Sequence, residues 1–484
     1  MEAPLLGGSK TVVADDYTPP TSVAEVAKVF KIETVRLWKI AAPLVFLSLC
    51  NYGTNTVTTI FVGHLGELEL SAVSIALSVI NTFAYGFLLG MGSALETLCG
   101  QAFGAGQIHM LGIFMQRSWI ILLLGCLAIL PIYIFATPIL KLLGQDDDIA
   151  ELAGQFTILT IPNLISLAIC FPAQKFLQAQ TKVRVLAWIG LLALVGHCFL
   201  LWLFIHVLGW GVSGAGIAFN FSRWVIVIAQ LIYIFGWCKD AWTGFSWAAF
   251  TDLWAFLKLS VASAVMLCLE VWYMMSIPLL TGGLDDAVIA VGSLSICTNL
   301  NGIVAMIFLG LEAAISVRVS NELGSHHPRA VKYSVHVAVS HSLIVGLLCF
   351  GLIFGTKNYF AVIYTDSVIL QQAVSNIAWL LGLSMLLNSV QFIITGVAIG
   401  GGWQAVVAYI NLGSYYCFGI PLGYLLGYVF KLGITGIWGG MISGTAVQTL
   451  ILLFILCRTN WNTEVEETVG RMQRWGGQEI KPQI

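Results

Sequence analysis

The sequence predicts an all-helical membrane protein that is built from two related bundles of six helices. Of its 484 residues, 58% are hydrophobic and 10% are charged, whereas soluble globular proteins carry about 25% charged residues. A short pattern also occurs twice, as LGMGSA at residues 89–94 and as LGLEAA at residues 309–314. Because the chain around both copies is almost wholly apolar, we expect one membrane bundle that has been duplicated.

Two further matches have the same order and nearly the same spacing. GHLGE at 63–67 corresponds to GGLDD at 282–286, and GVSG at 211–214 corresponds to GITG at 433–436. Glycine and leucine recur by chance in any hydrophobic protein, so a single match would carry little weight. Three matches in one order predict an internal repeat, and transporters built from repeats bind their substrates between the copies.

Apolar runs of about twenty residues form helices in a bilayer, because the backbone must satisfy its own hydrogen bonds there. We count twelve such runs, at residues 38–61, 70–95, 117–140, 153–172, 184–207, 213–237, 254–280, 288–314, 334–355, 371–397, 405–428 and 434–457.

The basic residues predict the orientation of these spans. If both termini are cytosolic, most basic residues fall on the inner side, including Lys175, Lys182, Arg184, Arg318, Arg329 and Lys332. The outer loops then hold only Lys141, Lys357 and Lys431, together with acids at 146–148 and 285–286. Basic residues are enriched in cytoplasmic loops, so we expect cytosolic termini.

The spans divide the chain into five parts. We expect a cytosolic tail at 1–35, a first lobe at 36–237, a cytosolic linker at 238–253, a second lobe at 254–457 and a cytosolic tail at 458–484. In the last tail, Val465, Val469, Met472 and Trp475 are spaced as on one face of a helix. We therefore expect an amphipathic helix on the cytosolic face.

Several functions are excluded by composition and by missing motifs. The net charge of -2 and the lack of a basic tract give no sign of nucleic-acid binding. The eleven cysteines are scattered and are interpreted as packing residues, and we expect no metal and no cofactor. There is no nucleotide-binding loop, so any transport must use a gradient. We expect no catalytic residues, and the expected partners are the bilayer, protons and a small organic solute or anion, with the protein acting as a monomer.

Glu270 is the leading functional residue, because it lies near the middle of the seventh span with no basic residue in reach on that helix. An acid at this depth is costly when ionised, and it usually faces a wet cavity or is protonated. A pH gradient could load and unload such a group. We interpret Glu270 as the proton-coupling residue; the alternative is a protonated packing residue. The repeat places Asn51 at the corresponding position of the first span.

Polar side chains in other spans are candidates for the cavity wall. Asn388 and Gln391 lie in the tenth span, and Asn299 and Asn301 in the eighth. These amides either hold substrate or form hydrogen bonds between helices, and they complete a patch with Glu270 only if the helices pack suitably.

Three more residues of the spans have open interpretations. Arg223, in the sixth span, needs a partner, which is either a substrate anion, an acid such as Glu96, or helix carbonyls. Trp272 and Tyr273 either form a wall for flat ligands or face lipid and packing neighbours.

Four residues near the inner ends of the second and eighth spans are candidates for a gate: Glu96, Gln101, Glu312 and Arg318. Ion pairs that break and form during opening would lie at this depth. Alternatively, these residues are only the solvated ends of helices.

Three motifs resemble plant members of the multidrug and toxic compound extrusion (MATE) family, also called detoxification proteins. They are ALETLCGQAFGAG at 94–106, RVSNELG at 318–324 and GGGWQ at 400–404. The resemblance spans roughly residues 35–460. It implies twelve helices in two lobes related by a pseudo-twofold axis, arranged as a V around a central cavity. It also implies export of flavonoids, alkaloids or organic acids from the cytosol in exchange for protons.

One residue departs from the family pattern. Members of this family typically carry a glutamate in span seven, which Glu270 matches, and an aspartate in span ten, where this chain has Asn388. An amide cannot titrate, so either Glu270 acts alone or the protein transports anions such as chloride without coupling. The resemblance further implies the vacuolar membrane, with the plasma membrane as the alternative.

Overall fold

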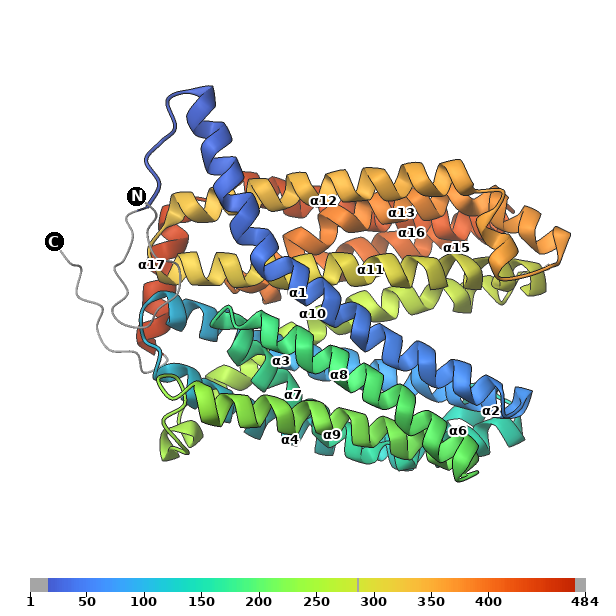
Figure 1. Ribbon diagram of the computed structural model, residues 1–484. Helices are drawn as coiled ribbons and strands as arrows, with labels where there is room; N and C mark the ends of the chain where they lie inside the picture. Colours follow the sequence, from blue (N-terminus) through green and yellow to red (C-terminus); the bar gives the residue numbers. More distant parts are fainter. Residues whose placement is uncertain (1–15, 285–286, 475–484) are drawn as a thin grey trace.

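The computed structural model describes residues 16–284 and 287–474, and the regular elements in these ranges are helices (Figure 1). The predicted outer acids Asp285 and Asp286, together with Trp475 and residues 1–15, lie outside the described ranges. The first half of the chain contains α1 (Val23–Gly63), α2 (Glu67–Ile75), η1 (Ala76–Asn81), α3 (Thr82–Gly104), α4 (Met110–Ile134), α5 (Ala136–Leu142), α6 (Asp147–Leu159), α7 (Ile161–Ala179), α8 (Val183–Leu201), η2 (Trp202–Val207) and α9 (Gly211–Trp237).

A short 3-10 turn, η3 (Trp247–Phe250), lies in the linker before the second half. That half contains α10 (Leu253–Thr281), α11 (Ala287–Gly324), α12 (Pro328–Thr356), η4 (Phe360–Ile363), α13 (Val368–Gly401), α14 (Gln404–Asn411), η5 (Leu412–Gly419), α15 (Ile420–Tyr424), η6 (Leu425–Val429) and α16 (Gly433–Arg458), and it is followed by α17 (Trp461–Arg474).

Each predicted apolar run corresponds to a helix or to a continuous series of helices. In the described ranges, ten helices are long and apolar enough to cross a membrane, and α6 with α7 forms an eleventh, bent by 47°. The remaining predicted span lies in α1, which is less apolar because it carries Asn51, Asn55 and several threonines. These threonine hydroxyls donate to carbonyls four residues earlier, as Thr54 does to Cys50 and Thr58 does to Thr54. The polar groups of α1 are thus partly satisfied within the helix itself.

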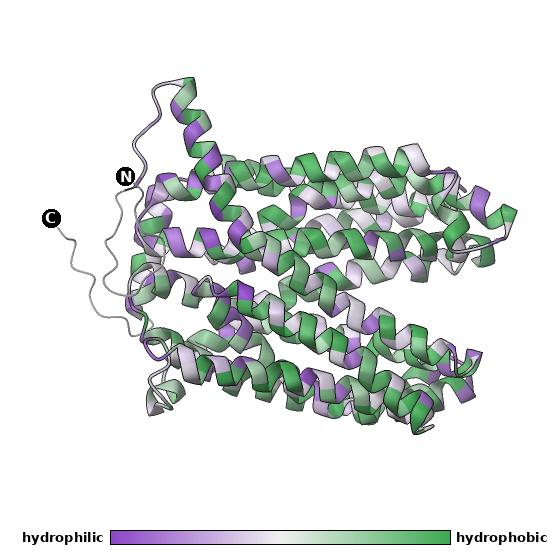
Figure 2. Cartoon of the chain, viewed as in Figure 1, coloured by the Kyte–Doolittle hydropathy of each residue, from purple (hydrophilic) through white to green (hydrophobic). Residues whose placement is uncertain are grey.

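The helices form two groups that converge at one end of the molecule (Figure 1). We call this end, where α1 begins and α17 lies, the α17 end. The groups meet where α3 packs against α10 and α11, and where α1 crosses α11. Figure 2 shows that hydrophilic residues are concentrated towards the two ends of the bundle, whereas the helices between them are mostly hydrophobic. This pattern is the one that a bilayer around the middle of the bundle requires.

The repeated sequence motifs provide matching contacts between the two halves. A Cβ atom on Gly90 would lie 2.6 Å from the Ala264 Cα atom, and one on Gly310 would lie 2.5 Å from the Val45 Cα atom. These glycines therefore allow two equivalent close crossings, of α3 with α10 and of α11 with α1. The repeated motifs therefore have equivalent positions in the fold, because Gly90 and Gly310 allow equivalent helix pairs to pack closely.

The same symmetry continues at the α17 end. A Cβ atom on Gly104 would lie 2.0 Å from the Asn321 carbonyl oxygen, and one on Gly324 would lie 2.1 Å from that of Gln101. Gly104 and Gly324 are equivalent in the repeat, as are Gln101 and Asn321. Here the backbones of the two halves are in direct contact, and no side chain larger than hydrogen fits at either glycine.

Three carbonyl groups at the end of α13 add hydrogen bonds to these backbone contacts. We call the contacts of Gly104 and Gly324, together with these hydrogen bonds, the seal. Thr97 donates to the Ile399 carbonyl at 2.5 Å, and the Gln101 amide donates to the Gly400 carbonyl at 3.1 Å. From α17, Arg471 donates to the Gln101 side-chain oxygen at 3.1 Å and to the Gly401 carbonyl at 2.9 Å. Arg471 thus connects α17 to both halves.

The C-terminal helix α17 is amphipathic, but its apolar face packs on protein. Trp461, Val465 and Met472 are buried in the core cluster that also includes residues of α3, α11 and α12. Trp403 donates to the Glu464 carboxylate at 2.9 Å and stacks on Trp461. The described part of this helix therefore covers the seal.

The start of α1 extends beyond the bundle and is held by charges of the second half. Glu33 is 1% exposed and accepts hydrogen bonds from Arg36 at 3.1 Å and Arg318 at 2.8 Å. The Tyr17 hydroxyl donates to the same carboxylate at 2.6 Å. Burial and the bond to Glu33 raise the pKa of Tyr17, so its phenol keeps the proton that it donates.

Candidate functional site

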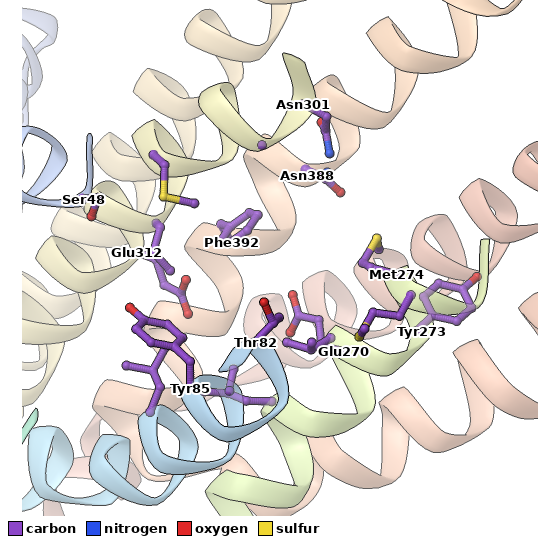
Figure 3. A pocket seen from close by; sticks show the side chains of 18 of the residues that line it. Ser48, Thr82, Tyr85, Glu270, Tyr273, Met274, Asn301, Glu312, Asn388 and Phe392 are labelled. Atoms are coloured by element: carbon purple, nitrogen blue, oxygen red, sulfur yellow. The ribbon is translucent and has the colours of Figure 1, made fainter. Parts of the chain in front are cut away.

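A cavity of about 950 Å³ lies between the two halves, lined by residues of α1, α3, α7, α10, α11, α13 and α16 (Figure 3). It extends from Glu96, Lys175 and Ser316, just above the seal, to Leu279 at the opposite end. Leu279 is 80% exposed, so the cavity reaches the surface at that end. Seal and cavity together describe a conformation that is closed at the α17 end.

Glu270 borders this cavity from α10 (Figure 3). Its Oε1 atom accepts a hydrogen bond of 2.6 Å from the Gln391 side-chain amide on α13, and its Oε2 atom has no hydrogen-bond partner. Among the described residues, no basic group forms an ion pair with it. The carboxyl group is thus held by one neutral donor, and its other oxygen is buried without a hydrogen-bond partner.

The predicted polar patch is formed only in part. Asn301 and Asn388 line the cavity, and Gln391 supports Glu270 without lining it. Asn299 is exposed and does not line the cavity, contrary to expectation. Residues two positions apart on a helix point in different directions, so Asn299 and Asn301 cannot share one face. Thr298 takes the place expected for Asn299.

Asn51 lines the cavity from α1 and accepts a hydrogen bond of 3.2 Å from Arg223 on α9. The Arg223 guanidinium also lies over the Phe219 ring, 5.3 Å from its centroid. Of the partners considered from the sequence, Glu96 is not used, because it pairs with Lys175 instead. Arg223 itself does not line the cavity, contrary to expectation, and within the described ranges it forms no ion pair with a carboxylate.

Trp272 and Tyr273 point in different directions. Tyr273 lines the cavity, is fully buried, stacks on Tyr415 and donates to the Met441 carbonyl at 2.6 Å. Trp272 is 43% exposed and stacks on Phe83 outside the central cavity. The expected aromatic wall therefore consists of Tyr273 and not of Trp272.

The floor of the cavity carries three ionisable groups. Lys175 on α7 pairs with Glu96 on α3 at 2.5 Å, and both side chains are less than 10% exposed. Glu312 on α11 is 7% exposed and lines the cavity. Lys175 lies just past the apolar run at 153–172, so the sequence predicted it only as one of the basic residues of the inner side. Its spacing from Gln174 and Gln178, which also line the cavity, was the signal that α7 continues with a polar face.

The other two gate candidates are not cavity residues. Gln101 is fully buried in the seal, and Arg318 pairs with Glu33 and Glu322 at the edge of the bundle. The four candidates thus belong to three separate features. Glu96 and Glu312 lie on the cavity floor, Gln101 lies in the seal, and Arg318 binds Glu33 and so anchors the start of α1. In the described ranges, no group of three or more metal-ligating side chains is found.

Comparisons with known proteins agree with this architecture. The MatE family model matches residues 43–203 and 262–425. Protein DETOXIFICATION 35 of Arabidopsis thaliana is 62% identical over 479 residues, which cover 99% of this chain and 98% of the relative. Protein DETOXIFICATION 34 of the same plant is 61% identical over 461 residues, which cover 95% of this chain and 85% of the relative.

Solved structures give the same result. The crystal structure of the eukaryotic MATE transporter AtDTX14 matches with a TM-score of 0.88 and 33% identity, covering 92% of this chain and 99% of that one. A MATE transporter of Vibrio cholerae, VcmN in its bent form, matches with a TM-score of 0.78 at 17% identity, covering 92% and 99%, which supports the fold alone. The predicted all-helical, two-lobed fold is confirmed. Since its relatives transport solutes and are not enzymes, this chain is a transporter and belongs to the MATE family.

Proposed function

We propose that the protein exports organic solutes of the flavonoid, alkaloid or organic-acid class from the cytosol by proton antiport, with Glu270 as the protonation switch. The cavity, at about 950 Å³, has the size of a site for such solutes. Its wall combines aromatic and thioether side chains, such as Tyr273 and Met274, with amides such as Asn301. The names of the detoxification relatives are in keeping with export.

The geometry of Glu270 is the observation that carries this proposal. An ionised carboxylate accepts the hydrogen bond from Gln391, as observed. A proton on Oε2 leaves this bond in place and turns Oε2 into a donor, which then needs an acceptor such as the amide oxygen of Gln391 or a cavity group. Proton binding therefore removes a negative charge between α10 and α13 and adds a donor there, and so changes the relative stability of two conformations.

The proton gradient provides sufficient energy for this exchange. Each unit of pH difference supplies about 1.4 kcal/mol per proton. In the proposed cycle Glu270 is loaded from the acidic side while the cavity is open there. It releases the proton after the cavity opens to the cytosol, where solute binds.

The test is solute flux in proteoliposomes with an imposed pH gradient. Glu270→Gln should reduce gradient-driven flux to the level of empty liposomes, whereas Glu270→Asp should keep some of it because that side chain can still titrate. Solute binding without a gradient should persist in Glu270→Gln, which shows that the variant is folded. Gradient-driven flux at the parent rate in Glu270→Gln would end this proposal.

A second candidate function is passive anion transport, and Arg223 favours it. Its guanidinium has only the Asn51 amide and the Phe219 ring as described partners. Asn388, which lines the cavity, cannot titrate. In this case current under voltage clamp with chloride would be independent of the pH gradient. It would fall in Arg223→Gln and remain in Glu270→Gln, which is the reverse of the antiport result.

We further propose that the protein is a monomer in the vacuolar membrane, with the α17 end and both termini in the cytosol and with lobes at 36–237 and 254–457. Basic residues such as Lys182, Arg318 and Arg329 lie on the α17 side. A tag at either terminus should be cleaved by protease added to intact isolated vacuoles. Protection of both tags would contradict the orientation, and a signal in the plasma membrane would contradict the compartment.

A further inference from the structure

Glu312 is a buried carboxylate for which the structure provides no direct partner. It is 7% exposed, lines the cavity and projects from α11 beside Tyr85 and Phe392 (Figure 3). Among the described residues it forms no hydrogen bond and no ion pair. A buried carboxylate without a partner is costly when ionised. In this conformation, the protonated form of Glu312 is therefore favoured over the ionised form.

The charged groups around Glu312 come from three other helices. Glu270 on α10, Glu96 on α3 and Lys175 on α7 all act on it electrostatically, and the Tyr85 phenol on α3 lies nearby. Two of these groups have the same charge as an ionised Glu312. Among the described cavity-lining residues, Lys175 is the one basic side chain.

Lys175 has two acids within electrostatic reach and a direct bond to one of them. It contacts the Oε2 atom of Glu96, whose Oε1 atom has no hydrogen-bond partner although Glu96 is only 3% exposed. The Lys175 ammonium group donates this hydrogen bond from the end of a flexible side chain and has three equivalent N–H donors, so it can move from one carboxylate to another. Because the Oε1 atom of Glu96 accepts no hydrogen bond, Glu96 is only partly satisfied by its pairing with Lys175.

These acids lie on opposite sides of the seam. Glu96 and Lys175 are in the first half of the chain and Glu312 is in the second. Along the repeat, Glu96 corresponds to Ser316 and Glu312 corresponds to Gly92, so the sister helices carry their acids one turn apart. A bond of Lys175 to Glu96 stays within one half, whereas a bond to Glu312 would connect the two halves directly above the seal.

We propose that Glu312 is a second proton-binding site, and that Lys175 moves from Glu96 to Glu312 when Glu312 loses its proton, forming an ion pair that locks the seam at the α17 end. When a proton from the cavity binds Glu312, the ammonium group of Lys175 returns to Glu96, which is the pairing in this structure, and only the glycine contacts and hydrogen bonds of the seal then hold the α17 end closed. Lys175 remains charged throughout, so one proton enters and one proton leaves per cycle at this site.

The direction of this effect matches the exchange described above. The cavity is open at the end opposite α17, so protons from that side reach Glu312 and favour opening towards the α17 side. Release of the proton on the α17 side restores the attraction of Lys175 to Glu312 and favours closing. The inference deepens the proposed antiport, but its test does not depend on flux.

The test measures opening at the α17 end directly. Ser316→Cys places a thiol on the cavity floor, and a membrane-impermeant maleimide is added only to the α17 face of sealed vesicles. The reporter is made in a Glu270→Gln background, so that the pH response of Glu270 is absent. Labelling rates at each pH are divided by those of the unfolded protein, which removes the intrinsic pH dependence of the thiol.

With Glu312 present, we expect the labelling rate to fall by about tenfold as pH rises, the size expected for one close ion pair across an interface. Glu312→Gln should give a rate that is high at every pH. Glu312→Asp should retain the fall. The double variant Glu96→Gln/Lys175→Met removes a charge pair as a unit, so it avoids an unpaired buried charge, and it should also give a flat profile.

The two proposals fail separately. A parent-like fall in labelling with Glu312→Gln, or with the double variant, would overturn the second site. Parent-like flux in Glu270→Gln together with a flat profile in Glu312→Gln would overturn the proposed function and keep the second site.

Discussion

The two ends of the seam between the halves differ in how the halves meet. At the α17 end, Gly104 and Gly324 bring backbone against backbone, and Thr97 and Gln101 donate to carbonyls. At the opposite end the seam is a cavity that extends to the exposed Leu279. The closed end thus depends on close backbone contacts and on hydrogen bonds to backbone carbonyls. Both are lost when the two halves separate even slightly. Such contacts make opening an all-or-none event, which suits a transporter that must never be open at both ends.

The largest expected effect comes from the anchor of α1 at the closed end. Glu33→Gln removes the charge between Arg36 and Arg318 and leaves a buried guanidinium with less compensation. Breaking a buried pair in this way costs about 3 kcal/mol or more. We expect a clear drop in the melting temperature of the detergent-solubilised protein.

The matched control lies on α6, which packs within the first half and away from the seal. Glu151 is exposed, and Glu151→Gln should leave the melting temperature unchanged. Equal effects of the two variants would mean that the closed end is not held by this anchor.

A smaller effect is expected from filling the glycine contacts. Gly104→Ala places a methyl group against the Asn321 backbone, and Gly324→Ala places one against the Gln101 backbone. Overpacking of this kind costs about 1–3 kcal/mol, which shifts the closing equilibrium by about fivefold to 150-fold. Both variants should increase maleimide labelling of Ser316→Cys from the α17 face, and by similar amounts, because the two positions are equivalent in the repeat.

Gly236 offers the control for this prediction. It lies in α9 with no other atom within 4 Å of an added Cβ, so Gly236→Ala should leave labelling unchanged. If Ser316→Cys were labelled as slowly with Gly104→Ala as in the parent, the closed state would accommodate the methyl group, and this prediction would be wrong.

Most of the fold followed from hydropathy, because the bilayer makes each long apolar run a helix. What the runs could not give were the ends of the helices. α11 continues to Gly324, since polar residues there such as Ser316 and Ser320 are buried against the other half. α12 begins at Pro328, and its first turns carry the exposed Arg329 and Lys332. The bend between α6 and α7 lies directly before Pro162, a residue that sequence reasoning passed over.

Several cavity residues were predictable because polar side chains are rare in apolar spans, as with Glu270, Asn301 and Asn388. Glu270 was found because an acid in mid-bilayer is unusual, and the structure places it beside the cavity. Its bond to Gln391 and the pair of Lys175 with Glu96 connect helices that are far apart in the sequence. Such contacts depend on the rotation of each helix about its axis, which hydropathy leaves undetermined. The roles of these residues in transport stay predictions.

The smallest expected effect concerns how pH acts on the cover of the closed end. Burial is the largest of the causes that raise the pKa of Glu464, which accepts a hydrogen bond from Trp403. A carboxyl group whose pKa is raised when α17 is docked favours docking while protonated. Docking should therefore be strongest below the ordinary glutamate range and should weaken as pH rises through the raised pKa.

Hydrogen exchange of residues 461–474, corrected for intrinsic rates, measures this dependence. Glu464→Gln keeps an oxygen acceptor for Trp403 but cannot ionise, so protection of α17 should become independent of pH in this range. Glu466→Gln changes an exposed carboxylate on the same helix and should keep the parent slope. Because Glu464 is only partly buried, the effect should be a modest change in protection. A parent slope in Glu464→Gln would assign the pH response to another group. A flat parent profile would mean that the docking of α17 does not respond to pH.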